Sequence, residues 1–523
     1  MLNHCSIRSL ILSLLLAMGL ATPGCGTNPV TKKRELQIVS ESQEIAIGQK
    51  NYAPTRQAQG GDYTLDAELT AYVQSVGNKL AAVSDRKLPY EFSIINDSTP
   101  NAWAMPGGKI AFNRGLLYEL NSEAELAAVM GHEMVHAAAR HGAKDMERGL
   151  LLQGAMIAVG IGAQDTDYAN LIVGGAQVGA QLVSSKYGRD AESEADFYGM
   201  QYMKKAGYDP TAAVSLQETF VRLSADRKSN FIDGLFASHP PSPQRVAANK
   251  STLNQLGAGG DLAKDSYAQK VSKLKSTQAA YKAYDDAVKA LANKDLEKAK
   301  NLVNQAIAGE PREAKFQELL ADMALMQKKP EAALALYAKA IAMQPDYFKP
   351  HMQSGIALFN MGKKAEAEPY LKRANALLPT APGHSLLGQI AEERGETALA
   401  MQHYQVAADS NSAIGKQAGT RLARLDLPHN PAKYLQARVE VDRAGSLYAV
   451  LQNNSALNVQ KVQFKVIKYE LKTGRVISRS APLTMRTGLA SGAKGQMALG
   501  LKVASLQEAQ AYKILLEAAE IQP

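Results

Sequence analysis

Residues 132–136 read HEMVH, and this stretch decides how the rest of the chain is interpreted. His132 and His136 are four positions apart, so in a helix their imidazoles lie one turn above each other and can bind one metal ion. Glu133 then flanks the position that the histidines leave open. In a chain of 523 residues with this composition, fewer than about 0.02 such motifs are expected by chance. The sequence therefore predicts a catalytic metal site on a helix.

The helix that carries this motif is predicted to begin after Ser122 and to run to about Met146. Ser122 can accept a hydrogen bond from the first turn, and Glu125 completes a capping box. Apolar spacing over residues 65–84 predicts a second helix. Alternating patterns predict strands over residues 90–95, 101–106 and 109–112, with a glycine turn between the last two. Helices and strands together indicate an α+β domain.

A metal site of this kind needs a third protein ligand. Glu192 and Asp196 are four positions apart on another predicted helix, so one carboxylate can bind the metal while the other holds an imidazole. His141 is expected in an outer or surface position. His239, before two prolines, has three open interpretations: it stabilises the oxyanion, it blocks the open metal position, or it is an ordinary loop histidine.

These motifs resemble the gluzincin metallopeptidases, the family of the HtpX heat-shock proteases and the CaaX prenyl endopeptidases. Three further stretches agree: residues 28–31 with 41–48, residues 101–107, and residues 239–241 with Arg245. The resemblance implies a zincin-like fold and one Zn²⁺ per chain. It also implies these roles: zinc ligands His132, His136 and Glu192, general base Glu133, outer carboxylate Asp196, and catalytic candidate His239.

The chain is most similar to a periplasmic branch of this family, the β-barrel assembly-enhancing proteases, in which the peptidase is joined to tetratricopeptide repeats. That resemblance implies an endopeptidase that hydrolyses misfolded or misassembled periplasmic and outer-membrane proteins. The strand around Trp103 would offer an edge to an extended polypeptide. The alternative is a chaperone or docking scaffold for outer-membrane assembly, with gated or minor proteolysis. Processing of prenylated proteins is excluded because the sequence lacks a set of membrane-spanning helices.

A 34-residue period begins near residue 275. Several columns of residues keep this interval: Pro311, Pro345 and Pro379; Ala306, Ala340, Ala374 and Ala408; Leu302, Leu336, Tyr370 and Tyr404; Ala299, Ala333 and Ala367. Paired helices with small residues at their contacts and a closing proline resemble tetratricopeptide repeats, about four of them. Such an α-solenoid usually presents a groove to protein partners, and the outer-membrane assembly machinery is the candidate partner here. The alternative is a spacer that only positions the other domains.

Beyond residue 428 the pattern alternates with period two, and residues 472–475 supply a turn, so a small β-sandwich is predicted. The fold class is thus multidomain and mainly α. The expected domains are a signal segment over 1–24, the peptidase over 28–255, the repeats over 275–425 and the sandwich over 430–523.

The N-terminus indicates export. A charge-free run over residues 9–21 is too short to span a bilayer comfortably, and small residues follow it. Cys25 is then a candidate lipidation site, which would place the protein in the periplasm on the outer membrane; cleavage to a soluble periplasmic protein is the alternative. Both cysteines, Cys5 and Cys25, lie near this end, so neither a disulfide framework nor a cysteine zinc cluster is expected in the body of the chain.

Composition excludes other classes. With 46% hydrophobic and 21% charged residues the chain is globular, and a net charge of +9 without a dense basic tract argues against nucleic acid. The charge-free stretches over residues 149–163 and 168–185 are expected to be buried or loosely packed helices, with contact to lipid or coverage of the cleft as the alternatives.

Overall fold

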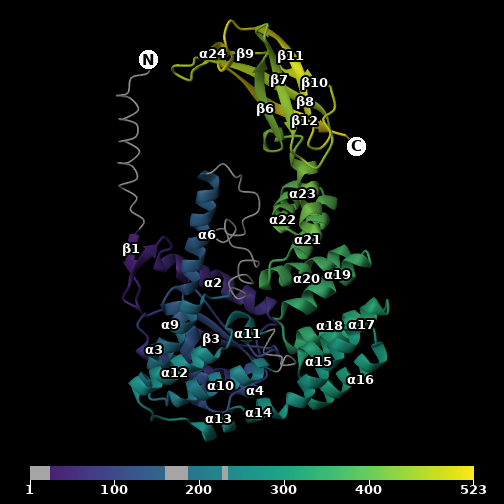
Figure 1. Cartoon of the computed structure of the whole chain (residues 1–523). Helices are drawn as coiled ribbons and strands as arrows, with labels where there is room; N and C mark the ends of the chain where they lie inside the picture. Colours follow the sequence, from purple (N-terminus) through teal and green to yellow (C-terminus); the bar gives the residue numbers. More distant parts are fainter. Residues whose placement is uncertain (1–23, 159–185, 226–233, 523) are drawn as a thin grey trace. The chain divides into compact units, whose positions relative to one another are not determined.

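The computed structural model describes residues 24–158, 186–225 and 234–522 (Figure 1). The chain divides into two compact units. The first unit comprises residues 1–354 and 376–379, and the second comprises residues 355–375 and 380–523. The predicted signal segment and the stretches over 159–163 and 168–185 lie outside the described residues. Among the helices that the structure describes, none is both long and apolar enough to cross a bilayer.

The first unit begins with a short hairpin and continues as a mixture of helices and strands. Its elements before the repeats are β1 (Gly24–Thr27), β2 (Arg34–Gln37), α2 (Glu41–Ala58), α3 (Ala67–Val83), β3 (Glu91–Ile95), β4 (Ala102–Met105), β5 (Lys109–Asn113), α4 (Arg114–Glu119), α5 (Glu123–Ala138), α6 (His141–Ala158), α9 (Arg189–Lys205), α10 (Thr211–Ala225), α11 (Leu235–Ser238), α12 (Pro243–Leu256), α13 (Lys264–Lys270) and α14 (Ser272–Ser276). The helix expected over 65–84 and the three expected strands are therefore confirmed.

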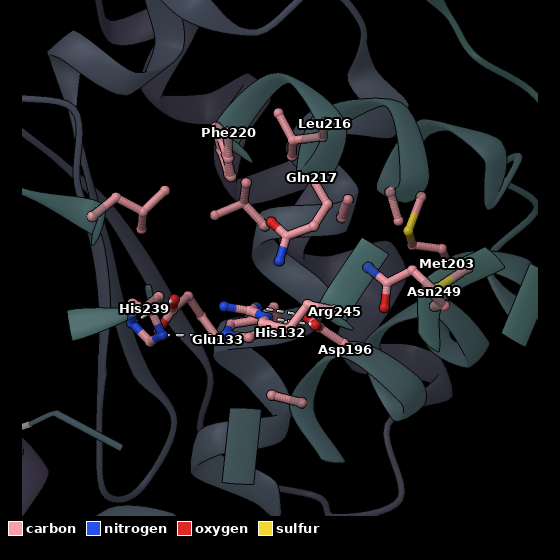
Figure 2. Close-up of a pocket in the computed structure, with 16 residues that line it drawn as sticks. His132, Glu133, Asp196, Met203, Leu216, Gln217, Phe220, His239, Arg245 and Asn249 are labelled. Atoms are coloured by element: carbon pink, nitrogen blue, oxygen red, sulfur yellow. Dashed lines mark hydrogen bonds and ion pairs between the residues drawn. The ribbon is translucent and has the colours of Figure 1, made fainter. Parts of the chain in front are cut away.

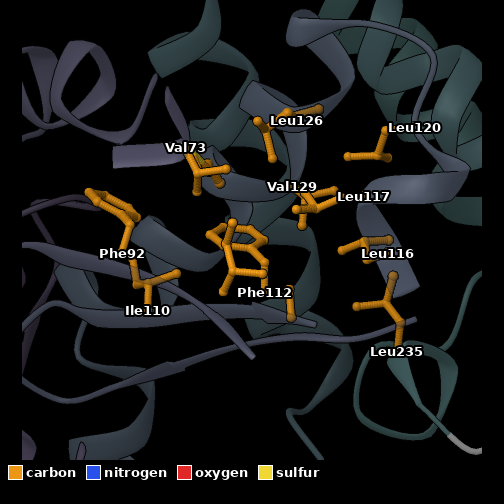
Figure 3. Packing of buried hydrophobic residues seen from close by; sticks show 14 of the residues in the cluster. Val73, Phe92, Ile110, Phe112, Leu116, Leu117, Leu120, Leu126, Val129 and Leu235 are labelled. Carbon is orange, nitrogen blue, oxygen red and sulfur yellow. The ribbon is translucent and has the colours of Figure 1, made fainter. Parts of the chain in front are cut away.

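A three-stranded sheet in the order β3–β5–β4 organises this region, with β3 parallel and β4 antiparallel to β5. Alternate residues of the sheet face opposite sides. On one side Phe112 and Ile110 pack with Val73 of α3 and with apolar residues of α4 and α5, as Figure 3 shows. On the other side Trp103 contacts Tyr52 of α2, with ring centroids 5.7 Å apart. The sheet is thus buried on both faces.

Helix α5 begins as the sequence predicts but ends earlier. The Ser122 side chain accepts a hydrogen bond from the Glu125 N–H. The expected capping box is incomplete, because the Glu125 carboxylate accepts from the N–H of Asn121 instead of that of Ser122. The expectation that the helix runs to about Met146 is wrong. Arg140 adopts φ 64°, a left-handed conformation that a right-handed helix cannot contain, and α6 starts at the next residue.

A buried charge network joins the N-terminal segment to the end of α5. Glu44 of α2 accepts hydrogen bonds from Arg86 at 2.9 Å and from Arg140 at 2.6 Å, and Arg140 also bonds Glu147 at 3.1 Å. Asn28 donates to the carbonyl of Ala139 at 3.0 Å. Buried charges are tolerated only when they are paired, so residues 28–44 are part of this structure.

Helix hairpins follow α14, and they confirm the predicted tetratricopeptide architecture. Their helices are α15 (Gln278–Ala292), α16 (Leu296–Gly309), α17 (Ala314–Met326), α18 (Pro330–Met343), α19 (Phe348–Asn360), α20 (Lys364–Leu377), α21 (Ala381–Glu393), α22 (Thr397–Ala408) and the additional α23 (Ala413–Asp426). The periodic alanines Ala306, Ala340 and Ala374 are buried on the second helix of successive hairpins. The periodic prolines lie just beyond those helices, where proline cannot disturb the helical hydrogen bonds.

Within the first unit, the first repeats pack on the peptidase region. The Arg114 guanidinium lies over the Tyr281 ring at 3.4 Å, and Asn96 donates to Glu313 at 2.9 Å. On α2, Gln57 donates to the carbonyl of Asp346 at 2.7 Å. Because these groups are buried, removal of residues 275–425 would expose them as well as delete the repeats.

The C-terminal part of the second unit contains two antiparallel sheets, as the predicted β-sandwich requires. After the 3₁₀ turn η1 (Pro431–Lys433), the elements are β6 (Leu435–Val441), β7 (Ser446–Asn453), β8 (Val459–Tyr469), β9 (Val476–Arg479), β10 (Leu483–Met485), β11 (Lys494–Lys502), α24 (Leu506–Ala509) and β12 (Tyr512–Ile521). One sheet has the order β11–β7–β6, and the other β10–β8–β12 with β9 also paired to β8. Leu451 of the first sheet and Phe464 of the second share one core.

Candidate metal centre

Two helices, α5 and α9, bring the predicted ligands together. His132 and His136 lie one turn apart on α5, and Glu192 lies in the first turn of α9. The helices approach closely at a glycine pair, since a Cβ on Gly131 would lie 2.9 Å from the carbonyl oxygen of Gly199. This close contact allows side chains from both helices to reach one point.

Four side chains offer donor atoms that all lie within 4.8 Å of one another: His132, His136, Glu192 and His239. His132 Nε2 is 3.0 Å from His136 Nε2 and 3.6 Å from Glu192 Oε2, and His136 Nε2 is 3.4 Å from Glu192 Oε1. A tetrahedral ion with bonds of about 2.0–2.1 Å separates its ligand atoms by roughly 3.3 Å. The donor set and its spacing therefore fit a zinc-sized cation.

Asp196 holds the His132 ring at its Nδ1 atom, and Arg245 in turn holds Asp196. The Asp196 carboxylate lies 2.9 Å from His132 Nδ1, which leaves Nε2 directed toward the other donors. Arg245 donates two hydrogen bonds to Asp196, both at 2.7 Å, and forms an ion pair with Glu192 at 2.8 Å. Burial alone would raise the pKa of Asp196, but the Arg245 guanidinium holds that pKa below its usual value. Asp196 therefore remains a carboxylate that orients the ring.

His136 is held by His141 and Tyr187. His136 Nδ1 is 2.8 Å from His141 Nδ1, and His141 Nε2 is 3.3 Å from Glu194. Burial lowers the pKa of both His136 and His141, so both are neutral. The Tyr187 ring stacks on His136 with centroids 3.9 Å apart. His141 is thus an outer partner and is not a surface residue.

Glu133 lies beside the four donors and borders a cavity of about 60 Å³ (Figure 2). It is fully buried, and within the described residues neither carboxylate oxygen has a hydrogen-bond partner. Burial raises the pKa of this carboxyl group. On the opposite side of the cavity, Leu216 and Phe220 of α10 form an apolar wall. Gln217 of the same helix is the polar residue on that side. A buried carboxylate that accepts no hydrogen bond is positioned to exchange a proton with a bound molecule.

His239 lies just after α11 and approaches the donors from a separate part of the chain. Its Nδ1 atom is 3.2 Å from His132 Nε2 and 2.9 Å from Glu192 Oε1, and its Nε2 atom is 3.4 Å from Glu133 Oε1. Burial lowers the pKa of His239, but the carboxylates of Glu133 and Glu192 outweigh burial and raise it. His239 Nδ1 therefore lies where a fourth ligand of the cation would lie.

The structure thus brings together His132, Glu133, His136, Glu192, Asp196 and His239. Cys25 belongs to β1, paired with Leu36 of β2, and its lipidation stays a prediction. Sequence reasoning missed Tyr187 and Gln217. Neither lies in a spacing pattern, so the sequence held no signal for them.

Comparison with known proteins gives matches over both predicted regions. Residues 67–253 match the model of peptidase family M48, and residues 278–348 and 324–390 match tetratricopeptide-repeat models. A β-barrel assembly-enhancing protease of Yersinia pestis is 26% identical over 449 residues, which cover 78% of this chain and 90% of that protein.

Other relatives align over a smaller share of their length. The mitochondrial metalloendopeptidase OMA1 of Schizosaccharomyces pombe is 32% identical, and the alignment covers 42% of this chain and 63% of that protein. A putative β-barrel assembly-enhancing protease of Vibrio cholerae is 28% identical, with 49% and 59% covered. A solved structure of Pseudomonas aeruginosa pilF is 16% identical and covers 41% of this chain and 83% of that one, at a TM-score of 0.27.

Proposed function

We propose that this chain, which carries a peptidase family M48 domain joined to tetratricopeptide repeats, is a zinc endopeptidase of the bacterial envelope. The observation that carries the proposal is the convergence of His132, His136 and Glu192 beside a buried Glu133, whose oxygens accept no hydrogen bond from the described residues. Zinc held there supplies Lewis acidity toward a water molecule and a peptide carbonyl.

In this proposal each side chain has a separate task. His132, His136 and Glu192 bind the zinc, and Asp196 orients His132. Glu133 accepts a proton from the attacking water and delivers it to the leaving nitrogen. Burial raises the pKa of Glu133, which makes its carboxylate a stronger base toward water than an exposed carboxylate.

His239 keeps the enzyme latent in this proposal. Its Nδ1 atom lies at ligand distance from the other donors, where substrate or water would have to bind. Displacement of the residues after α11 would open this position. The variant His239→Ala is then expected to cleave an unfolded substrate faster than the parent chain. A lower rate would instead favour the oxyanion role, and an unchanged rate would make His239 an ordinary loop residue.

An extended polypeptide is the proposed substrate. Strand β4 is at one edge of its sheet, but its four residues are buried, so an added strand would bind there only after the main-chain groups of that edge are uncovered. The cavity between Glu133 and α10 would receive one substrate side chain. The candidate signal segment supports a periplasmic location. Because the Yersinia relative is a β-barrel assembly-enhancing protease, misfolded or misassembled envelope proteins are the proposed substrates.

The second candidate, a chaperone or docking scaffold with minor proteolysis, is favoured by the position of His239. The two are distinguished by Glu133→Gln in cells. If the protein acts as a protease, cells that carry this variant show the phenotype of cells without the protein. If it acts as a scaffold, they behave like cells with the parent chain, because Gln preserves the size of the side chain and the fold.

The purified chain tests the enzyme directly. We expect about one zinc per chain and casein cleavage that a chelator abolishes and zinc restores. Glu133→Gln should retain zinc and lose at least about 100-fold in rate. Glu218→Gln, which changes an exposed carboxylate of α10, is the matched control and should cleave normally. A chain without zinc, or an active Glu133→Gln variant, would refute the proposal.

A further inference from the structure

The C-terminal sheets carry most of the net positive charge of the chain. Residues 430–523 contain 13 Lys and Arg and 6 Asp and Glu, so they contribute +7 of the net +9. The metal centre lies in the other unit, and the proposed proteolysis uses none of this charge. An excess of this size on about 90 residues indicates an anionic partner.

Part of this charge is concentrated on the β8–β9 hairpin. Every residue from Leu471 to Arg479 is exposed, and the run includes the cations Lys472, Arg475 and Arg479. Gly474 adopts φ 71° and allows the tight turn. The one carboxylate at the base of the turn, Glu470, accepts a hydrogen bond from the Thr473 hydroxyl. The hairpin therefore presents cations with little competing negative charge.

Large apolar side chains are exposed between these cations. Ile477 is 56% exposed and Leu471 is 51% exposed, and Val476 lies next to them. Single exposed apolar residues are common, but a run of them on one hairpin marks a contact surface. The cations next to them make this surface complementary to an anionic partner.

The outer face of the same sheet extends this surface. Phe464 points into the sandwich core, so Lys465 and Ile467 lie on the other face, where Ile467 is itself covered by its neighbours at 5% exposure. Directly opposed residues share a face, and Ile467 is paired with Arg479 on one side and with Lys513 on the other. Leu515, 44% exposed, is paired with Lys465, whose charge Glu517 neutralises. Exposed cations and apolar side chains thus continue from the hairpin onto β12.

We propose that this surface, formed by Leu471, Lys472, Arg475, Val476, Ile477, Arg479, Lys513 and Leu515, docks on an anionic phospholipid bilayer. Charge complementarity supports this partner, because lysine and arginine contact lipid phosphates while neighbouring apolar side chains enter the headgroup region. An acidic protein would match the cations but would need its own pockets for Leu471 and Ile477. The contact is separate from the proposed active site.

Vesicle binding by the full chain tests this inference. The chain carries Cys25→Ser so that no acyl group contributes. We expect binding to vesicles of phosphatidylethanolamine and phosphatidylglycerol, weak binding to phosphatidylcholine vesicles, and loss of binding at high salt. Changing Lys472, Arg475 and Arg479 together to Gln should weaken binding about 100-fold, at roughly fivefold for each cation. Ile477→Ser should weaken it separately.

Matched changes on the other sheet serve as controls. Lys494→Gln removes one charge and Leu501→Ser one exposed apolar group, both on β11, and each should bind like the parent chain. An unchanged thermal midpoint shows that each variant is folded. Equal binding to neutral vesicles, no binding to anionic vesicles, or full binding by the triple variant would overturn the inference. Capture of an acidic protein without vesicle binding would assign the surface to that partner instead.

Discussion

Gly131 of α5 and Gly199 of α9 contact each other through their backbones, directly beside the first candidate ligand. A Cβ atom on Gly199 would lie 2.9 Å from the backbone nitrogen of His132. Any side chain at this point must therefore push the two ligand-bearing helices apart.

Gly199→Ala should weaken zinc binding by about tenfold, because displaced helices no longer place Glu192 opposite the histidines. Overpacking should also lower the free energy of unfolding by about 1–3 kcal/mol. Zinc titration and denaturant unfolding measure the two effects. Gly188→Ala, on a residue with φ −69° and with nothing described within 4 Å of its added Cβ, should change neither. Equal zinc affinity in both variants would contradict the role of the glycine contact.

Asp196→Asn should lower zinc affinity by about 10–100-fold. The carboxylate accepts from His132 and is bound by Arg245, and an amide would both lose its charge and place an NH₂ group against one of these donors. Competition with a chromophoric chelator measures the affinity. Asp190→Asn on the exposed start of α9 is the control and should bind zinc as tightly as the parent chain. Similar losses of zinc affinity in the two variants would mean that removal of one negative charge from α9, and not loss of the bond to His132, weakens zinc binding.

The chain of contacts from His136 to Glu194 predicts the effect of changes at His141. If His136 binds metal through Nε2, its proton is on Nδ1 and is donated to His141 Nδ1, so His141 donates from Nε2 to Glu194. His141→Phe removes the acceptor and should weaken zinc binding by about tenfold. His141→Gln retains an acceptor and should recover part of the affinity. Identical affinities in the two variants would show that His141 only fills space.

A second histidine pair predicts how stability depends on pH. His384 Nδ1 on α21 and His403 Nδ1 on α22 are 3.0 Å apart, and burial lowers the pKa of His384 to about 4. The unfolded chain, with a pKa near 6.5, binds this proton more readily than the folded chain. Stability should therefore be complete above about pH 6.5 and fall as the pH decreases toward 4.

His384→Gln should reduce this loss, which thermal unfolding between neutral pH and pH 4 measures as a smaller fall of the melting temperature. His429, exposed after α23, is the control position, and His429→Gln should leave the pH dependence unchanged. A parent chain whose melting temperature does not fall below pH 6.5 would contradict the prediction.

Local patterns were sufficient to predict the helices that carry the candidate ligands. His132 and His136 are four residues apart, as are Glu192 and Asp196, so each pair lies on one helical face whatever the tertiary structure. The end of α5 was predicted too late because Arg140 leaves the helical conformation and bonds Glu44 and Glu147, partners that lie on two other helices and that no local pattern indicates.

Contacts between elements that are distant in the sequence were harder to predict. His239 lies 107 residues after His132, and only the packing of α11 brings its ring to the other donors. The Tyr187 stacking on His136 likewise depends on where the chain returns to α5. Such contacts leave no periodic trace in a single sequence, whereas the 34-residue repeat does, because each unit makes the same contacts with the next.

The charge network around Glu44 has a consequence for where the folding unit begins. The match to peptidase family M48 starts at residue 67. Yet Asn28 donates to the Ala139 carbonyl and Glu44 accepts from the Arg140 guanidinium, both directly after the end of α5. A fragment cut at the family boundary would leave Arg86 without Glu41 and Glu44, and Arg140 with Glu147 alone, in a water-poor interior. The smallest expressible peptidase is therefore longer at its beginning than its sequence signature suggests.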